Sequence, residues 1–300
     1  MRTIAFLAEK GGVGKSSLCI NIAAALISHF QRRVLLVDLD GLSSLTQTLA
    51  PEGVPFGETV AAALIGLTPI GAVARKTPYV NLHIVPSSVQ MKNLEDMDLS
   101  ETPSAADRCD SAGRLLDTAL ASELAGLPGG YDYVLVDCPG GVRFIEQMAL
   151  LACDEVLIPT GLSVLDFYGL TPTLELVADA QAVRDGKPAI LGFLPNSASS
   201  KGIPPEMKAF LQGYSLPLFS PVRASQTMKS APGRPNLEKR LVVVSQPQSA
   251  VALSIVQVTR EIEMGIEAAR AYAAVVEAAM DAAQATASGD VAVLAAGVVS

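Results

Sequence analysis

The amino-acid sequence predicts an α/β protein built on a doubly wound, mostly parallel β-sheet flanked by helices. Six short apolar runs contain few alternating polar residues, which is typical of strands buried on both faces of a sheet. Segments with apolar residues at helical spacing separate these runs, and that alternation indicates parallel strands joined by helices. A glycine-rich stretch directly after the first run is the third observation. In such folds, ligands bind at the carboxyl ends of the strands.

The expected strands and helices follow one another along most of the chain. The apolar runs are Thr3–Ala8, Arg33–Asp38, Val80–Val85, Tyr133–Asp137, Glu155–Pro159 and Ala189–Leu194. The helical patterns are Ser16–Ile27, Thr59–Leu67, Ala112–Ala125, Phe144–Ala152, Val164–Val183 and a long one from about Ser249 to Ala283. We expect irregular chain over Ser87–Ser111 and loops over Gly202–Pro235, which carries several prolines. We therefore expect one domain over residues 1–283 and a flexible tail over residues 284–300.

The composition is that of an ordinary globular protein. Half of the residues are hydrophobic, 17% are charged, and the net charge is −8. No apolar run is long enough to cross a bilayer, and the first residues lack the layout of a signal peptide. The four cysteines Cys19, Cys109, Cys138 and Cys153 show no paired short spacing, which is typical of free thiols. We therefore expect a cytoplasmic protein.

The stretch Glu9–Ser17 reads EKGGVGKSS and departs from the usual phosphate-binding loop. That pattern is Gly, four free residues, then Gly-Lys-Ser or Gly-Lys-Thr, so the first glycine should fall where Glu9 stands. Glycines 11, 12 and 14 can still carry the turn, and a phosphate would sit at the N-terminus of the next helix. Lys15 would reach the β- and γ-phosphates and Ser16 would bind Mg²⁺. A plain glycine turn is the structural alternative, which the Gly-Lys-Ser placement disfavours.

Acidic residues stand at the ends of two expected strands. Asp137 ends the run in YDYVLVDCPG, the arrangement of a Walker B aspartate that holds Mg²⁺. Asp38 and Asp40 end the run in VLLVDLD, beside the expected phosphate crevice, and one of them could position an attacking water. The alternative for all three is a strand-to-loop transition with capping aspartates.

The motifs KGGVGKSS, VLLVDLD and YDYVLVDCPG together resemble the ParA/MinD family of deviant Walker A ATPases, most closely a short ParA-type partition ATPase. The match runs over roughly residues 2–270. Asn21 in INIAAAL and the segment Ser163–Leu170 also fit. One departure stands in the first switch, where Gly41-Leu42-Ser43 replaces the family's usual Pro-Gln-Gly.

The resemblance implies an ATPase that binds Mg-ATP and dimerises around it. Lys10 would be the signature lysine that reaches the partner subunit's phosphates, Asp40 would position the water, and Asp38 would lie on the metal side. The implied catalytic residues are Lys10, Lys15 and Asp40, and the implied metal site comprises Ser16, Asp38 and Asp137. The nucleotide-binding residues would be Lys10, Gly11, Gly12, Val13, Gly14, Lys15, Ser16, Ser17, Asn196, Pro221 and Val222.

The charge of the chain is unevenly distributed. Residues 184–240 contain nine basic and three acidic residues, a net charge of +6, whereas the rest of the chain carries −14. Such asymmetry indicates a surface that faces a polyanion, or a solvated surface whose charges happen to cluster. ParA-like proteins bind non-specific DNA as ATP dimers, and the resemblance therefore favours DNA. The expected DNA-binding residues are Lys201, Lys208, Arg223, Lys229, Arg234, Lys239 and Arg240.

The sequence leaves several functions open. The expected function is segregation or positioning of plasmid or chromosome DNA on the nucleoid, with a ParB-like or other protein activating ATP hydrolysis. A MinD-like or orphan ParA-like ATPase would instead position a protein complex or the division site. MinD-like proteins bind membrane through a basic amphipathic C-terminal helix, and no lysine or arginine follows Asp281, so no membrane is expected. A reductase of the nitrogenase iron-protein type would use two cysteines, here Cys109 and Cys138, whose surroundings do not match cluster motifs.

Overall fold

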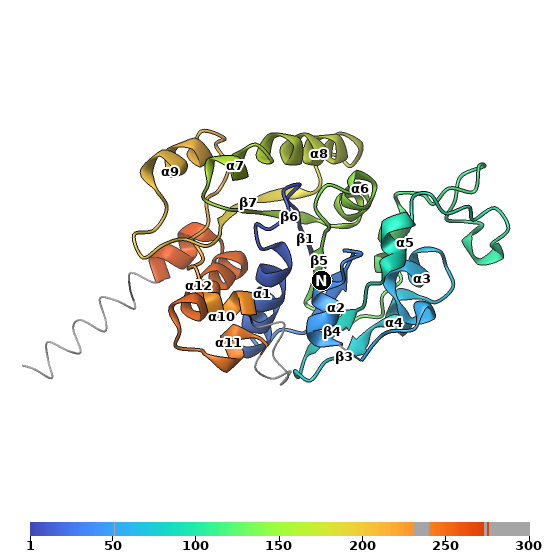
Figure 1. Ribbon diagram of the computed structural model, residues 1–300, viewed down its shortest axis with the longest axis horizontal. Helices are drawn as coiled ribbons and strands as arrows, with labels where there is room; N and C mark the ends of the chain where they lie inside the picture. The colour runs from blue at the N-terminus through green and yellow to red at the C-terminus, as the bar shows by residue number, and fades with distance from the viewer. Residues whose placement is uncertain (51, 231–239, 273–274, 276–300) are drawn as a thin grey trace, which may run out of the picture. The chain divides into compact units, whose positions relative to one another are not determined.

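The computed structural model describes residues 1–50, 52–230, 240–272 and 275, which form two compact units. The first unit, Met1–Val258, contains a seven-stranded sheet in the order β3-β4-β2-β5-β1-β6-β7 (Figure 1). The strands are β1 Arg2–Phe6, β2 Val34–Asp38, β3 Arg75–Lys76, β4 Leu82–Val85, β5 Tyr133–Asp137, β6 Glu155–Thr160 and β7 Ala189–Pro195. All neighbours are parallel except β3 and β4. The predicted doubly wound, mostly parallel sheet is confirmed.

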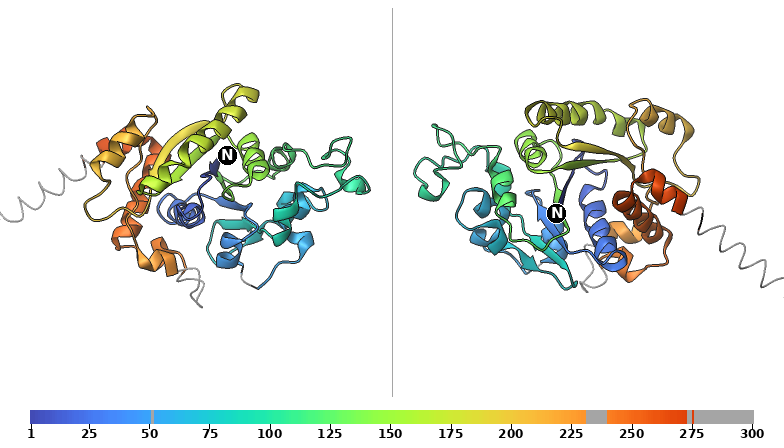
Figure 2. Two further views of the ribbon diagram at one scale, coloured as in Figure 1. Left: turned by 45° about the horizontal axis from the view of Figure 1, so that its top comes forward. Right: turned by 180° about the vertical axis from the view of Figure 1, so that it is seen from behind.

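The described residues also form α-helices. They are α1 Lys15–His29, α2 Ser44–Leu49, α3 Val60–Leu64, α4 Ile70–Val73, α5 Ala119–Ala125, α6 Arg143–Ala152, α7 Val164–Phe167, α8 Leu170–Val183, α9 Pro205–Gln212, α10 Gln226–Ser230, α11 Val242–Ser245 and α12 Ala250–Met264. Short 3₁₀ turns are η1 Phe56–Glu58, η2 Val89–Asn93 and η3 Pro103–Ala105. In two directions of view, α1 lies on one side of the central strands and α5 and α6 on the other (Figures 1 and 2).

The strand register brings the acidic strand ends together. Strands β2 and β5 are buried along their whole length, as expected for a sheet covered on both faces. Asp38 at the end of β2 pairs with Asp137 at the end of β5, and Phe6 at the end of β1 pairs with Asp137 too. The loop that follows β1 therefore begins at the same edge of the sheet as both aspartates.

Several elements differ from the sequence prediction. Helix α5 begins at Ala119, seven residues later than expected, and the expected helix Val164–Val183 is two helices separated at Tyr168–Gly169. The expected long C-terminal helix ends at Met264 because Gly265 adopts a positive φ of 83°, which ends the regular α-helix. Helical structure resumes over residues 266–272. The two-residue strand β3 was not predicted. The predicted domain boundary at residue 283 and the predicted flexible tail lie outside the described residues.

Candidate nucleotide-binding site

The glycine loop between β1 and α1 adopts the backbone that its sequence predicts. Gly12 and Gly14 have φ values of 82° and 96°, which residues with a Cβ adopt only at a cost. Helix α1 begins directly after Gly14, so its free N–H groups face the loop. Glu9 stands where the usual pattern has glycine, and it is not among the described residues with positive φ. Its backbone N–H donates to Thr173 Oγ1 at 3.1 Å, so this position requires no glycine.

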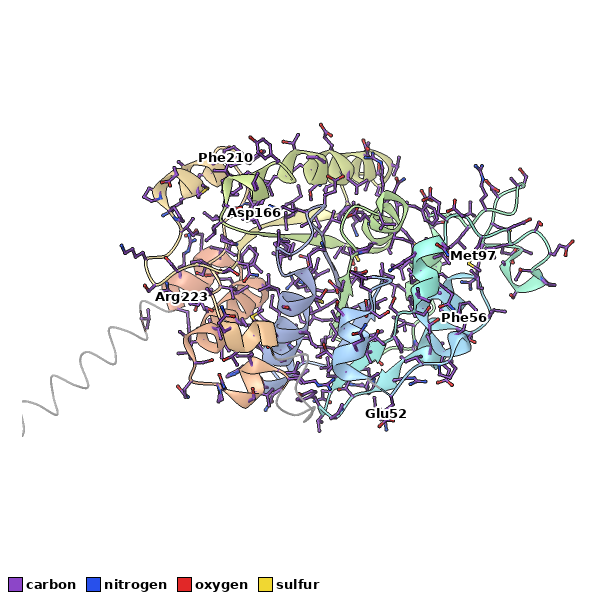
Figure 3. All side chains as sticks on the ribbon, in the orientation of Figure 1. Glu52, Phe56, Met97, Asp166, Phe210 and Arg223 are labelled. Atoms are coloured by element: carbon purple, nitrogen blue, oxygen red, sulfur yellow. The ribbon has the colours of Figure 1, made fainter. Side chains whose placement is uncertain are left out.

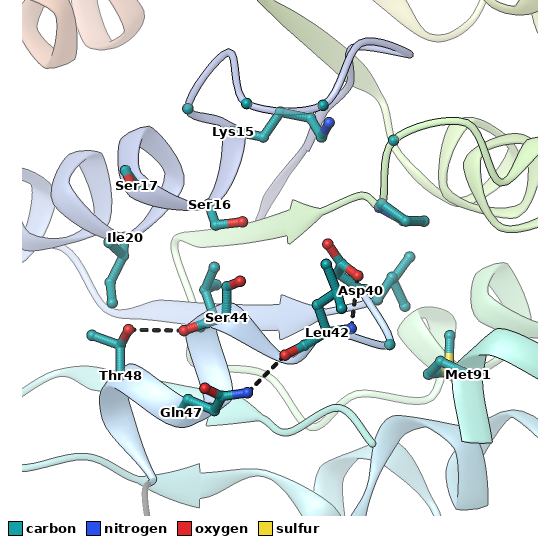
Figure 4. Close-up of a pocket in the computed structure, with 18 of the residues that line it drawn as sticks. Lys15, Ser16, Ser17, Ile20, Asp40, Leu42, Ser44, Gln47, Thr48 and Met91 are labelled. Atoms are coloured by element: carbon teal, nitrogen blue, oxygen red, sulfur yellow. Dashed lines mark hydrogen bonds between the residues drawn. The ribbon is translucent and has the colours of Figure 1, made fainter. Parts of the chain in front are cut away.

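Lys15 lies in a cavity of about 860 Å³ between this loop and the end of β2. Figure 4 shows Lys15 and Ser16 on the side of the loop and Asp40 and Leu42 across from them. The Lys15 ammonium donates to the carbonyl of Ala8 at 2.8 Å and to that of Lys10 at 3.4 Å. The cavity has the size of a small-ligand pocket, and its loop side offers N–H groups and a cation to an anion.

Two buried carboxylates lie at the strand ends beside the cavity. Asp38 accepts hydrogen bonds from the Thr46 N–H, the Thr46 hydroxyl and the Asp40 N–H at 2.9, 2.7 and 3.2 Å. Burial nevertheless raises the pKa of Asp38 to about 6, against the hydrogen bonds from Thr46. Asp137 is fully buried, and neither of its carboxylate oxygens has a hydrogen-bond partner among the residues that the structure describes. Burial and the negative charge of Asp38 raise the pKa of Asp137 well above its ordinary value, against the smaller effects of the nearby Ser16 hydroxyl and Lys15 ammonium.

These carboxylates fit a hard divalent cation. An unpartnered buried carboxylate is costly, and a bound cation would supply the missing charge partner. Within the described part of the chain, no group of three His, Cys, Asp or Glu side chains could hold a metal by itself. That agrees with Mg²⁺, which keeps water ligands and binds through one or two carboxylates together with substrate phosphates. Ser16, at the first turn of α1, lines the same cavity.

The loop after β2 carries Asp40 into the cavity. One Asp40 carboxylate oxygen accepts the N–H of Leu42 at 2.8 Å, which fixes the side chain against its own loop. Gln47 on α2 donates to the carbonyl of Leu42 at 2.8 Å (Figure 4). Asp40 thus faces the same space as Lys15 and Ser16, as the predicted role in positioning water requires.

Lys10 does not line the cavity of its own chain. Its ammonium forms an ion pair at 2.7 Å with Asp166 on α7, a residue that Figure 3 labels. Burial acts to raise the pKa of Asp166, but hydrogen bonds from Lys10 and Ser163 outweigh it, and the pKa is lower than usual. Gly169 permits this approach, because a Cβ there would lie 3.1 Å from the Lys10 Cβ.

The residues predicted to contact the base do not line this cavity. Asn196, Pro221 and Val222 are not among its lining residues. The Asn196 side-chain amide donates to the carbonyl of Val13 at 2.8 Å, and the Val222 N–H donates to the carbonyl of Pro195 at 2.8 Å. The structure therefore places Asn196 against the glycine loop, and the base contacts stay a prediction.

The predicted DNA-binding residues have different surroundings. Lys201 and Lys208 are exposed, and Arg223 is half-buried and donates to the carbonyl of Ser199. Lys229 lies on α10, and Arg234 and Lys239 lie outside the described residues. Arg240 is buried in the cavity wall, where it donates to the carbonyls of Gln47 and Thr48 at 2.8 and 2.9 Å. Because a buried guanidinium cannot contact a DNA backbone, we leave Arg240 out of the proposed DNA surface.

Sequence reasoning missed several residues of the site. Thr46 donates hydrogen bonds to Asp38 and follows it by eight residues in the chain. A Ser or Thr shortly after an acidic strand end is the sequence pattern that could have indicated it. Lys92 and Met228 line the cavity from the segments η2 and α10. No local motif marks them, because they reach the site only through the fold. Cys138, a candidate cluster ligand, is fully buried, and burial raises its thiol pKa well above the usual value.

These features define a P-loop nucleotide-binding protein. They are a glycine loop at a strand-to-helix junction, a lysine and a serine at the end of that loop, and acidic residues at the ends of the adjacent parallel strands. The family model described as an AAA domain matches residues 1–187. The chromosome-partitioning ATPase Soj of Treponema pallidum is 32% identical over 181 residues, which are 60% of this chain and 65% of Soj. The chain thus spans slightly under two thirds of the length of that relative.

Solved structures share the fold over most of the chain. The septum site-determining protein MinD of Pyrococcus horikoshii, complexed with Mg-ADP, has a TM-score of 0.65 at 25% identity, covering 87% of this chain and 95% of MinD. A McdA–ATP complex from Cyanothece has a TM-score of 0.72 at 20% identity with the same coverage, a likeness of fold. The chain therefore belongs to the ParA/MinD family of P-loop ATPases. In the described residues, no helix is both long and apolar enough to cross a membrane.

Proposed function

We propose that the protein is a ParA-like ATPase that binds Mg-ATP, dimerises around it, and hydrolyses it to ADP and phosphate. The observation that carries this proposal is the unpartnered, buried Asp137 carboxylate beside Asp38, next to the loop that presents Lys15. Mg²⁺ would neutralise the two carboxylates and the nucleotide phosphates together. Ser16, Asp38 and Asp137 would hold it.

Catalysis in this proposal is positioning and charge stabilisation. The glycine loop and Lys15 bind the phosphates, and Lys15 neutralises charge that develops on the γ-phosphoryl oxygens. Asp40 faces the same cavity and orients the water that attacks the γ-phosphorus. We expect hydrolysis to be slow in the isolated protein, and faster with an activating protein of the ParB-like or another class.

The dimer is proposed from the position of Lys10. Its ammonium reaches Asp166 and does not line its own cavity, so it lies free of the phosphates that its own chain would bind. Next to Asp166 on α7, Val164 and Leu165 are 60% and 67% exposed, and Tyr168, which follows α7, is 74% exposed. Apolar side chains of this size gathered at one edge are typical of a protein contact. In the proposed dimer, Lys10 leaves Asp166 and contacts the partner subunit's phosphates.

We further propose that the ATP dimer binds DNA through backbone phosphates and serves to segregate or position DNA on the nucleoid in the cytoplasm. Support comes from the net charge of +6 over residues 184–240 in a chain of net charge −8. Lysine and arginine contacts to phosphates need no base-reading motif. Lys201, Lys208, Arg223 and Lys229 belong to this surface, together with Arg234 and Lys239, which lie outside the described residues.

A second candidate is a MinD-like or orphan ParA-like ATPase that positions a protein complex or the division site. The likeness in fold to MinD favours it. The two candidates share the nucleotide site and differ in the surface that the dimer binds. Flotation with anionic liposomes in the presence of ATP separates them, because only the MinD-like protein should float.

The nucleotide site is tested by equilibrium binding and sedimentation. Lys15→Ala should weaken ATP binding by about 100-fold, because it removes the cation that faces the phosphates. Lys10→Ala should keep nucleotide binding and lose ATP-dependent dimerisation. Lys76→Ala, at an exposed position on the edge strand β3, is the matched control. A Lys15→Ala protein with wild-type ATP affinity would remove the proposed function.

The DNA surface is tested by co-sedimentation with non-specific duplex at low and high salt. We expect binding that requires ATP and weakens steeply with salt, since each phosphate contact releases counterions. The double variant Lys201→Glu/Lys208→Glu should weaken binding at every sequence tested, whereas Lys76→Glu should not. Binding that is independent of ATP, or insensitive to salt, would count against the ParA-like function.

A further inference from the structure

Gly41, in the departure from the family's first-switch sequence, lies in tight contact with Lys92. A Cβ built on Gly41 would lie 2.5 Å from the Lys92 Cγ and 3.3 Å from both its Cε and its backbone nitrogen. Carbon atoms do not approach to 2.5 Å without displacement. The absence of a side chain at Gly41 therefore allows the Lys92 side chain to pack against the loop after β2, next to Asp40.

Lys92 is an exposed residue that lines the nucleotide cavity together with Lys15, Ser16 and Asp40. It belongs to η2, which follows β4. The contacts described within the chain include no hydrogen bond or ion pair of its ammonium. The simplest alternative is a solvated lysine at the mouth of a cavity, which would gain nothing from the space at Gly41.

The other basic side chains in and near the cavity already have partners. Among the residues that the structure describes, the basic ones that line the cavity are Lys15, Lys92 and Arg240. Lys15 donates to two carbonyls of its own loop, Arg240 donates to the carbonyls of Gln47 and Thr48, and Lys10 is paired with Asp166. Lys92 is thus the basic lining residue with no described partner of its own, on the Asp40 side of the cavity.

We propose that Lys92 is a phosphate-contacting residue that supplies a second cation from the same subunit to the terminal phosphate of the nucleotide. The inference rests on the proposed nucleotide-binding function and assigns a further residue to it. Lys15 approaches the phosphates from the glycine loop, and Lys92 approaches them from across the loop of Asp40. Gly41 and Lys92 depend on each other, because any Cβ at position 41 would displace the aliphatic part of the Lys92 side chain.

The charge is tested by measuring the affinities of ATP, ADP and AMP for Lys92→Met, which keeps the length of the stem and removes the ammonium. We expect ATP affinity to fall about tenfold, ADP affinity by less, and AMP affinity to stay unchanged, as a contact to the terminal phosphate requires. Lys92→Arg should restore ATP affinity, and the surface variant Lys76→Met should match wild type. Equal ATP affinity of Lys92→Met and wild type overturns the proposal.

The pairing is tested by a double-mutant cycle. Gly41→Ala should weaken ATP binding about as much as Lys92→Ala, and the double variant should be no weaker than either single variant. Purely additive losses would remove the pairing. Circular-dichroism melting of each variant without nucleotide detects a variant that fails to fold, and Lys92→Met then carries the test alone. If the wild-type protein binds no ATP in this assay, the proposed function fails, and if only the Lys92 effect is missing, this inference alone fails.

Discussion

The buried strand ends beside the nucleotide cavity, here called the floor, and the edge formed by α7 differ in how fully the fold determines them. Asp38 and Asp137 make up the floor and do not themselves line the cavity. Asp38 and Asp137 are fully buried at adjacent strand ends, and the strand register fixes their positions. At the edge, Lys10 and Asp166 form a partly exposed ion pair beside the exposed Leu165. The floor holds charge that costs free energy until a ligand arrives, whereas the edge holds apolar surface that costs free energy until it is covered.

The comparison indicates two separate requirements for a complete site. The floor is incomplete without a cation and phosphates, and those are small ligands. In the proposed dimer a protein surface covers the edge, to which Lys10 belongs. We therefore propose that nucleotide chemistry depends on the floor of one chain and dimerisation on the edges of two chains.

The largest expected effect of a single change is on the edge. Leu165→Asp places a charge where the proposed dimer buries an apolar side chain, so the dimer dissociation constant with ATP should rise by about 100-fold. ATP affinity of the monomer should stay unchanged. Analytical ultracentrifugation and nucleotide titration measure the two quantities, and Val80→Asp, at an exposed apolar position before β4, is the control. A dimer as stable as wild type would show that the partner does not cover α7.

A smaller effect is expected on the floor, in the stability of the nucleotide-free protein. Asp137→Asn removes a buried charge that has no described hydrogen-bond partner, so it should stabilise the protein at pH 8 by about 1–2 kcal/mol. The same variant should bind Mg-ATP more weakly. Thermal melting without nucleotide measures the gain, and a variant that melts below wild type at pH 8 would contradict the account of the floor.

The pH dependence of that gain follows from the pKa shifts. Burial raises the folded-state pKa of Asp38 to about 6 from 3.8, and it raises that of Asp137 as well. The folded state then binds these protons more tightly than the unfolded state, so their contribution favours folding at low pH and is lost as pH rises through the folded-state pKa values. Asp38 is present in both proteins, so the difference in melting temperature between Asp137→Asn and wild type follows the titration of Asp137. It should widen as pH rises above the ordinary Asp137 pKa of 3.8.

The smallest expected effect is on the ion pair of the edge. Asp166→Asn removes the charge that holds Lys10 within its own chain, and a partly exposed pair contributes at most about 1 kcal/mol. Dimerisation with ATP should therefore strengthen by a few-fold at most, because Lys10 is released for the partner. Sedimentation with ATP measures the dimer dissociation constant. Asp179→Asn, which removes an exposed ion pair with Arg143, is the control. Weaker dimerisation would mean that Asp166 supports the interface itself.

The two regions also differ in how far the sequence predicts them. Lys15, Asp38 and Asp137 belong to local patterns at strand ends, and parallel strands bring such ends to one edge, so their meeting could be predicted. The burial of Arg240 and the position of Lys92 in the cavity lining could not be predicted, because each depends on contacts with segments far away in the chain. The contact between Gly169 and Lys10 could not be predicted for the same reason.

The claim that Lys10 acts on the partner's nucleotide is tested most directly by mixing two inactive variants. The Lys10→Ala subunit keeps Asp40 but cannot contact the phosphates bound by its partner. The Asp40→Ala subunit cannot hydrolyse its own ATP but can still contact its partner's phosphates through Lys10. Each mixed dimer keeps one Lys10 contact and contains one complete site, so phosphate release should rise above that of either variant alone, to at most about half of the wild-type rate per dimer. Sedimentation of the mixture with ATP establishes that the mixed dimer forms. If the mixture stays as inactive as the separate variants, Lys10 acts within its own chain and the central claim is wrong.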